Sequence, residues 1–274
     1  MAGHVVGTYL EEQGNDVTLL AGHKKINDKT IILDLTQKQL LDDYLSNNTF
    51  DIVINCIGIL VQQSENRKDL ATYLNSFLPH YLAHRFANTN TKLIHLSTDC
   101  VFSGQNGPYK EDSPYDGDTF YDRSKALGEV VNDKDLTFRM SIIGPDAFEE
   151  GVGLFNWFQK QTGTIFGFKN AIWNGITTVE LARGIDQAIK QNLTGLYHLT
   201  PKQNINKLDL ITLFKKVFNR DDIIIKPKDN EPTDKTLINT RTDFDFKVND
   251  YPTMIEEMKV WIDNHKDLYP HYNK

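Results

Sequence analysis

Cysteine is scarce in this sequence, positive charge is not in excess, and no apolar run approaches the length that spans a membrane. The two cysteines, Cys56 and Cys100, have the spacing of neither a metal site nor a disulfide framework, so we expect free buried thiols, no metal and a reducing cytoplasm. The 30 lysines and arginines stand against 37 aspartates and glutamates, and the net charge of −7 gives a nucleic-acid partner little electrostatic support. No signal peptide is visible either, so no membrane partner is expected.

Short β-branched runs alternate with helical patterns through the first half of the chain. The runs predict strands, and segments with an apolar residue every three or four positions predict helices. We expect strands at 17–20, 30–33, 51–56, 92–97 and 136–140, and helices at 37–45, 69–87 and 119–131. Pro79 should kink or break the second of these helices. The alternation predicts an α/β fold with a Rossmann-like, doubly wound parallel sheet.

The second half of the chain is less regular. We expect helices at 152–161, 178–191, 207–218 and 253–264, and short strands at 195–199 and 223–225. Thr177 and Glu180 fit a capping box that opens the helix at 178. Since no flexible linker is evident, we predict a nucleotide-binding domain at 1–145 and a smaller, mainly substrate-binding lobe at 146–274, from which about 178–199 return to the first domain.

The beginning of the chain departs from the usual order of a dinucleotide-binding fold, which is a strand, a Gly-rich turn and then a helix. Here Gly3 leads directly into a helical pattern at 4–12 and would be the last glycine of that turn. Either the chain lacks the first strand and part of the turn, or the protein opens with a surface helix. We favour the first interpretation, because everything after Gly3 continues the fold in register.

The loop after the expected strand at 17–20 bears on the choice of cofactor. An NAD site would place an acidic residue near here to bind the ribose 2′-hydroxyl, but the loop contains His23, Lys24 and Lys25 instead. This favours NADP(H), although NAD(H) stays possible and the loop could simply be solvated. Asp34, which follows the next strand, could contact the adenine or could cap the following helix.

The end of the strand at 51–56 is a second candidate for cofactor contact. Asn55, Cys56 and Gly58 lie where the carboxyl edge of a parallel sheet binds ligands. Gly58 would let the backbone approach a cofactor closely, or it is an ordinary turn glycine.

The candidate catalytic residues are Thr98, Tyr121 and Lys125. Tyr121 and Lys125 are four residues apart, so their side chains project from one face of a helix. A lysine ammonium beside the phenol would lower the tyrosine pKa, and a hydroxyl from the strand end at Thr98 could hold a carbonyl oxygen nearby. These are the parts of a proton-transfer site for the interconversion of a ketone and an alcohol.

Three segments carry a resemblance to a known family: S-T-D-C-V-F-S-G at 97–104, P-Y-K-E at 108–111 and Y-D-R-S-K-A-L-G-E at 121–129. They resemble the extended short-chain dehydrogenases/reductases and, more narrowly, the dTDP-4-dehydrorhamnose reductase (RmlD-like) group. Asn75 matches an asparagine on a helix near the active site of that group. The resemblance covers nearly the whole chain from Gly3 on, and it is loose after Met140.

The resemblance implies roles for individual residues. Tyr121 would donate the proton, and Lys125 would hold the nicotinamide ribose and lower the tyrosine pKa. Thr98 would bind the sugar carbonyl or hydroxyl. Together with the residues predicted above from their positions, the candidate cofactor contacts are Gly3, His23, Lys24, Asp34, Asn55, Cys56, Gly58, Asn75, Tyr121 and Lys125, and the candidate substrate contacts are Thr98, Val101, Phe102 and Trp173. Trp173 could stack on a base or sugar, or could pack in the interior.

The implied function is NADP(H)-dependent reduction of a nucleotide-linked 4-keto-6-deoxysugar in surface polysaccharide biosynthesis, by a protein that could be a homodimer. Related dehydratases have a glutamate where Cys100 stands, and a thiol is a poor substitute, which counts against that activity. Departures from the family pattern at 139–145 and 172–178 leave the sugar and the base open. An NAD-dependent sugar-nucleotide epimerase and a non-catalytic NADP-binding regulatory subunit are the alternatives.

Overall fold

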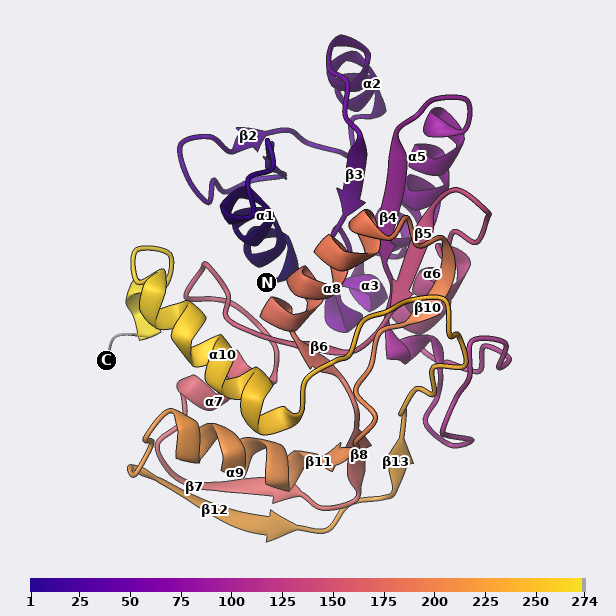
Figure 1. The fold of residues 1–274 in the computed structure, drawn as a ribbon. Coiled ribbons are helices and arrows are strands. Elements are labelled where there is room, and N and C mark those ends of the chain that lie inside the picture. The colour runs from indigo at the N-terminus through magenta and orange to yellow at the C-terminus, as the bar shows by residue number, and fades with distance from the viewer. Residues whose placement is uncertain (273–274) are drawn as a thin grey trace.

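The computed structural model describes residues 1–272, and a four-stranded parallel sheet lies in the upper part of the molecule as drawn in Figure 1. The strands follow one another in the order β10-β5-β4-β3. Their bounds are β3 Ile52–Asn55, β4 Lys92–Leu96, β5 Leu136–Arg139 and β10 Gly195–His198. Every residue of β4 and β5 is buried, as expected for inner strands of a parallel sheet that is covered on both faces.

Two hydrophobic clusters cover the two faces of this sheet. One face packs against α1 (Ala2–Glu12) and α8 (Thr178–Lys190), and the other packs against α2 (Lys38–Asn47) and α5 (Leu78–Phe86). Successive residues of β4 serve opposite faces, because Leu93 belongs to the α5 cluster and Ile94 to the α8 cluster. The predicted Rossmann-like arrangement is therefore present.

A separate pair of short parallel strands lies near α1 in Figure 1. β1 (Leu20–Ala21) and β2 (Ile31–Ile32) are shorter than the predicted strands at 17–20 and 30–33. Among the described residues β1 pairs with β2 alone, and β3 pairs with β4 alone. The predicted helix after Gly3 is present as α1, which begins at Ala2.

The predicted helix at 69–87 has a different construction. The segment runs through α3 (Val61–Asn66), α4 (Lys68–Ala71), a π-helical turn η1 (Thr72–Phe77) and α5. Pro79 does not break the helix, because it lies in the first turn of α5, where a missing N–H costs little. The irregularity lies one turn earlier, in the π-helical turn that contains Asn75.

The C-terminal lobe consists of small sheets and helices, and its hydrophobic core is continuous with the cluster that covers the α1 and α8 face of the central sheet. Its strands are β6 (Ile142–Ile143) paired with β9 (Ile176–Thr177), β7 (Gly163–Phe168) paired with β12 (Ile223–Lys228), and β8 (Ala171–Trp173) between β11 (Ile205–Asn206) and β13 (Thr233–Asp234). The helices are α7 (Leu154–Gln159), α9 (Lys207–Val217), α10 (Tyr251–Asn264) and a final 3₁₀ turn η3 (Pro270–Tyr272).

The chain returns from this lobe to the central sheet, because β10 pairs in parallel with β5 after α8. Thr177 caps α8 by accepting from the backbone N–H of Glu180, but the Glu180 carboxylate accepts from Asn249 and Arg183 instead of completing a capping box. The boundaries of the two domains stay a prediction. No helix within residues 1–272 is long and apolar enough to cross a membrane.

Candidate active site

The carboxyl end of β4 and the helix α6 (Phe120–Leu127) supply the three candidate catalytic residues. Thr98 follows β4 and caps the 3₁₀ turn η2 (Asp99–Val101), where its hydroxyl oxygen accepts from the backbone N–H of Cys100 at 3.1 Å. A reciprocal capping box between Thr119 and Asp122 fixes the beginning of α6. Tyr121 therefore lies in the first turn of α6, and Lys125 lies one turn later.

The structure brings Thr98, Tyr121 and Lys125 together, and all three are buried. The Thr98 hydroxyl lies near enough to the Tyr121 phenol to lower the pKa of that phenol. The Lys125 ammonium donates to the carbonyl oxygen of Leu96 at 2.8 Å, at the end of β4. Tyr121 and Lys125 therefore both lie at the carboxyl edge of the sheet.

The predicted lowering of the tyrosine pKa is not found. Burial raises the pKa of Tyr121, and the Cys100 thiol adds to this effect, while the hydrogen bond with Thr98 opposes it. Burial also lowers the pKa of Lys125 to about 8, against the opposing influence of Glu129 and Cys56. The prediction considered only the lysine charge, but transfer of a phenolate out of water has the larger effect on the tyrosine.

Gly58 and Asn75 lie beside the catalytic lysine. A Cβ atom built on Gly58 would lie 3.3 Å from Asn75 Oδ1 and 3.9 Å from Lys125 Nζ. Asn75 is fully buried, and its side chain bonds to both backbone groups of Ile59 and donates to the Ser124 hydroxyl at 3.0 Å. Asn75 thus connects the loop after β3 to α6, and its predicted contact with a cofactor stays a prediction.

Gly3, Asn55 and Cys56 meet at the end of β3. A Cβ atom on Gly3 would lie 3.5 Å from the Cys56 Cβ, which places the beginning of α1 against this strand end. Asn55 Nδ2 lies 3.2 Å from His95 Nδ1, and the side-chain oxygen Oδ1 of Asn55 accepts from the backbone N–H of Ile57. Both cysteines are free, and burial raises the pKa of each thiol to about 12.

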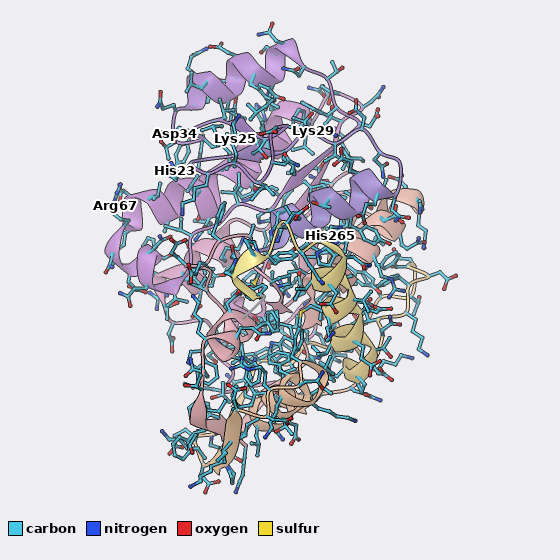
Figure 2. The ribbon with its side chains drawn as sticks, turned by 90° about the vertical axis from the view of Figure 1, so that its left-hand side faces the viewer. His23, Lys25, Lys29, Asp34, Arg67 and His265 are labelled. Atoms are coloured by element: carbon cyan, nitrogen blue, oxygen red, sulfur yellow. The ribbon has the colours of Figure 1, made fainter. Side chains whose placement is uncertain are left out.

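The loop after β1 differs from the rest of the predicted site because it is open to solvent. His23, Lys24 and Lys25 are exposed, and Figure 2 shows His23 and Lys25 near Asp34. Lys24 pairs with the exposed Glu150 at 3.3 Å. Asp34 accepts from the backbone N–H and hydroxyl of Thr36 at 3.0 and 2.7 Å, and these bonds lower its pKa. Asp34 therefore orders the turn before α2 without capping that helix, whose N-cap is Gln37, and its contact with adenine stays a prediction.

The structure does not support substrate contact through the side chains of Val101 and Phe102. Both side chains are fully buried, and the Phe102 ring stacks on Tyr109 with centroids 4.1 Å apart. Aromatic burial against a neighbouring ring explains why this position is apolar. Val101 and Phe102 thus hold the loop in place from behind.

Trp173 also takes its packing alternative. It is 5% exposed, and its indole N–H donates to the Ser141 hydroxyl at 2.8 Å. The ring also lies beside Tyr251, and the Lys207 ammonium lies 4.3 Å from the ring centroid.

A buried ion pair behind the site was missed by sequence reasoning. The side chains of Glu129 and Arg139 are 1% and 0% exposed and meet at 2.6 Å. Glu129 also accepts from the hydroxyls of Ser97 at 2.5 Å and Tyr115 at 2.8 Å, and Arg139 contacts His198 Nε2 at 2.8 Å. The pair joins the segment after α6 to the carboxyl ends of β4, β5 and β10. The Gly128-Glu129 end of the recognised motif was the available signal.

No cluster of histidine, cysteine, aspartate or glutamate side chains within residues 1–272 is arranged to hold a metal ion. A parallel sheet with a threonine at the end of β4 and a Tyr-x-x-x-Lys helix beside it defines a Rossmann-like protein of the short-chain dehydrogenase/reductase type. The chain belongs to the RmlD substrate binding domain family, whose model matches residues 2–238. The family predicted from the sequence motifs is confirmed.

Curated relatives match only part of this chain. The dTDP-4-dehydrorhamnose reductase of Streptomyces griseus is 32% identical over 132 residues, which cover 47% of this chain and 40% of that protein. The spore coat polysaccharide biosynthesis protein SpsK of Bacillus subtilis (strain 168) is 40% identical over 83 residues, or 30% of this chain and 29% of that one. The matches span less than half of either relative.

Solved structures share the fold over most of the chain. A hypothetical dTDP-4-dehydrorhamnose reductase from Sulfolobus tokodaii has a TM-score of 0.76 at 24% identity, covering 91% of this chain and 94% of that one. A dTDP-4-dehydrorhamnose reductase from Bacillus anthracis str. Ames, in complex with NADP, has a TM-score of 0.74 at 19% identity, covering 85% and 89%. At these identities the likeness concerns the fold, and it confirms the predicted Rossmann-like α/β class.

Proposed function

We propose that this protein catalyses the NADPH-dependent reduction of a nucleotide-linked 4-keto-6-deoxysugar. The observation that carries the proposal is the convergence of Thr98, Tyr121 and Lys125 at the carboxyl edge of the sheet. A binding role alone does not require a buried phenol, hydroxyl and ammonium in one corner. The relatives named as dTDP-4-dehydrorhamnose reductases support the choice of reaction.

The residues around Lys125 suit a nicotinamide cofactor. Gly58 is exposed and lacks a side chain, so the backbone leaves open the space beside the Lys125 ammonium. When bound, NADPH supplies the hydride that reduces the ketone carbon. The protein must then deliver a proton to the ketone oxygen and stabilise the charge that remains.

Tyr121 is suited to be the proton donor, because its raised pKa keeps the phenol protonated at neutral pH. Transfer of this proton to the ketone oxygen completes the alcohol and leaves a phenolate. With a pKa of about 8, Lys125 is still largely charged at pH 7, and one helical turn from Tyr121 on α6 its charge would stabilise that phenolate. Thr98, which lies beside the phenol, would hold the ketone oxygen against it for this transfer.

The biological setting is proposed from the name of one relative. The name of SpsK refers to spore coat polysaccharide biosynthesis, which supports a role in making surface polysaccharide. We expect the protein to act in the cytoplasm, where nucleotide-linked sugars are made, and to bind no nucleic acid. A homodimer stays a prediction.

The proposal is tested by measuring NADPH oxidation with a panel of nucleotide-linked 4-keto sugars. We expect turnover with at least one of them, and we expect Tyr121→Phe to lower kcat by about 10²–10⁴-fold without changing NADPH affinity. Phe77→Tyr, an exposed change on η1, is the matched control and should keep full activity. Retained turnover in Tyr121→Phe would refute the proton-donor role. NADPH binding without turnover on any sugar would favour the regulatory-subunit alternative.

A further inference from the structure

A long loop separates the two candidate catalytic hydroxyls along the chain. Thr98 is the N-cap of the turn η2, and Tyr121 lies in the first turn of α6. Residues 102–118, here called the connecting loop, join η2 to α6. Loops are generally more mobile than the elements they connect. The position of η2 relative to α6 therefore depends on how the two ends of the connecting loop are held.

The Asp116 carboxylate binds the end of the connecting loop to its beginning. Its Oδ1 accepts from the backbone N–H of Ser103 at 2.7 Å, and its Oδ2 accepts from the Ser103 hydroxyl at 2.8 Å and from Asn106 Nδ2 at 2.9 Å. Burial raises the pKa of Asp116, but these hydrogen bonds outweigh burial and lower it, so the carboxylate is ionised at neutral pH. Hydrogen bonds to an ionised acceptor are the strong ones.

Gly117 brings η2 and α6 into direct contact. Its N–H donates to the carbonyl oxygen of Val101, the last residue of η2, at 3.1 Å. A Cβ atom built on Gly117 would lie 2.8 Å from the carbonyl oxygen of Cys100, in η2, and 2.5 Å from the Cβ of Asp122, in α6. Only a residue without a side chain fits between these two elements. Asp122 belongs in turn to the capping box that begins α6.

Tyr109 joins the same loop to the C-terminal lobe. Its hydroxyl oxygen accepts from the backbone N–H of Gly104 at 3.0 Å, and its O–H donates to Asp116 Oδ2 at 3.4 Å. Its backbone N–H donates to the carbonyl oxygen of Thr236 at 2.8 Å, and its own carbonyl oxygen accepts from the N–H of Ile238 at 2.7 Å. The middle of the connecting loop is thus fastened to the lobe, and Asp116 connects that attachment to the two ends of the loop.

We propose that Asp116 and Gly117 are positioning residues, which hold η2 against α6 so that Thr98 and Tyr121 reach the same ketone oxygen. Asp116 does this by closing the connecting loop, and Gly117 does it by allowing direct packing. Where it concerns turnover, this inference rests on the proposed function. A misplacement of about 1 Å can cost about 10²-fold in rate, so a loosened loop should slow proton transfer.

The structural step is tested without any substrate, by hydrogen exchange measured with NMR on the full chain. In Asp116→Ala the Ser103 N–H loses its acceptor and should exchange about tenfold faster or more. The N–H of Cys100, which donates to the Thr98 hydroxyl oxygen, should also exchange faster, because η2 is no longer held. Asp112→Ala, which removes an exposed carboxylate from the same loop, is the matched control and should leave both rates unchanged. An unchanged rate at Cys100 in Asp116→Ala would overturn the proposal.

The catalytic step is tested by steady-state kinetics with the reduced sugar in H₂O and in D₂O. Asp116→Ala should lower kcat by about 10–100-fold, with little change in KM or in NADPH affinity. The solvent isotope effect on kcat should increase, because proton transfer from Tyr121 becomes slower than the other steps. A structural role alone would lower the fraction of folded enzyme and leave the isotope effect unchanged, and that result would contradict a positioning role.

A second variant tests the packing without removing any hydrogen bond of the carboxylate. Gly117→Ala places a methyl group between η2 and α6, so it should lower kcat and raise the solvent isotope effect as Asp116→Ala does. Gly22→Ala, at a position where a Cβ would meet no atom within 4 Å, is its control and should keep full activity. Full activity in Gly117→Ala would show that the direct contact of η2 with α6 is not needed.

The positioning role and the proposed function fail in different ways. If no keto sugar is reduced, the proposed function fails, while hydrogen exchange still decides whether Asp116 holds the turn at Thr98. If sugars are reduced and Asp116→Ala is fully active, the reductase function stands and the positioning role is wrong.

Discussion

The catalytic corner and the loop after β1 were both predicted as parts of one site, yet they differ in nearly every physical respect. Tyr121, Lys125 and Thr98 are buried, and the side chains of Lys125 and Thr98 are hydrogen-bonded to neighbouring groups, whereas His23 and Lys24 are exposed. A buried polar group needs a partner, so its position is tightly constrained. An exposed lysine can exchange its partners for water at little cost. The comparison teaches that the residues proposed for catalysis are held more rigidly than the loop residues proposed to select the cofactor.

The largest predicted effect concerns the buried ion pair between Glu129 and Arg139. Glu129→Gln leaves the fully buried Arg139 charge without its counter-ion, and we expect a loss of about 3–5 kcal/mol in the free energy of unfolding. Denaturant unfolding measures the loss. The matched control is Asp69→Asn, which breaks the exposed pair with Arg67, labelled in Figure 2, and should leave stability unchanged. Equal losses of stability in Glu129→Gln and Asp69→Asn would show that the buried ion pair matters no more for stability than the exposed one.

The next effect concerns the pH range of the reaction. The pKa of Lys125 is lowered to about 8, so the ammonium loses its proton as pH rises through 8, and kcat should fall about tenfold per pH unit above that value. Lys125→Arg should move this alkaline limb to higher pH, because a guanidinium stays charged. Since Lys207 also has a pKa of about 8, Lys207→Arg serves as control and should leave the limb in place. An unchanged limb in Lys125→Arg would assign it to another group.

A smaller effect is expected at Gly58, in the loop after β3 beside Lys125. Gly58→Val should lower NADPH affinity by about tenfold, because a side chain would fill the space beside Lys125 Nζ. Fluorescence titration with NADPH measures this affinity. Gly22→Val, at a glycine whose Cβ would meet no atom within 4 Å, is the control and should bind NADPH normally. Normal binding by Gly58→Val would show that the cofactor does not approach this backbone.

The smallest effect is predicted for the exposed loop. Lys24→Ala should weaken NADPH binding only a few-fold and NADH binding not at all, because the lysine is solvated and already shared with Glu150. Lys29→Ala, which removes a different exposed cation beside the same loop, is the comparison variant. A loss of NADPH affinity in Lys24→Ala as large as that in Gly58→Val would mean that the loop after β1 is held as rigidly as the residues around Lys125.

Part of the site was predictable because it depends on neighbours in sequence. The four-residue spacing of Tyr121 and Lys125 places both on one helical turn, and the Thr119–Asp122 box marks where that helix begins. The apolar runs at β3, β4 and β5 likewise identify buried parallel strands. Such sequence patterns predict structure reliably because each depends on residues within a single helix or strand.

Other features were not predictable because they depend on residues far apart in the chain. The π-helical turn at Asn75 is stabilised by bonds to Ile59 and Ser124, which no local pattern reports. Phe102 was assigned to the substrate because its motif was recognised, but Tyr109 and Arg139 enclose it. Lys207 and Lys235, whose charges lower the pKa of Asp99, lie in the C-terminal lobe. Nothing in their local sequence connects them with the motif that contains Asp99.

The sequence by itself determined the α/β class, the family and the identities of the three candidate catalytic residues, because periodicity and motif spacing are local properties. Only the tertiary structure decided the electrostatics. It reversed the expected shift of the Tyr121 pKa and let the charge of Lys207 act on the pKa of Asp99. Desolvation and through-space charge depend on which distant groups surround a side chain, and that is fixed only when the two halves of the chain pack together.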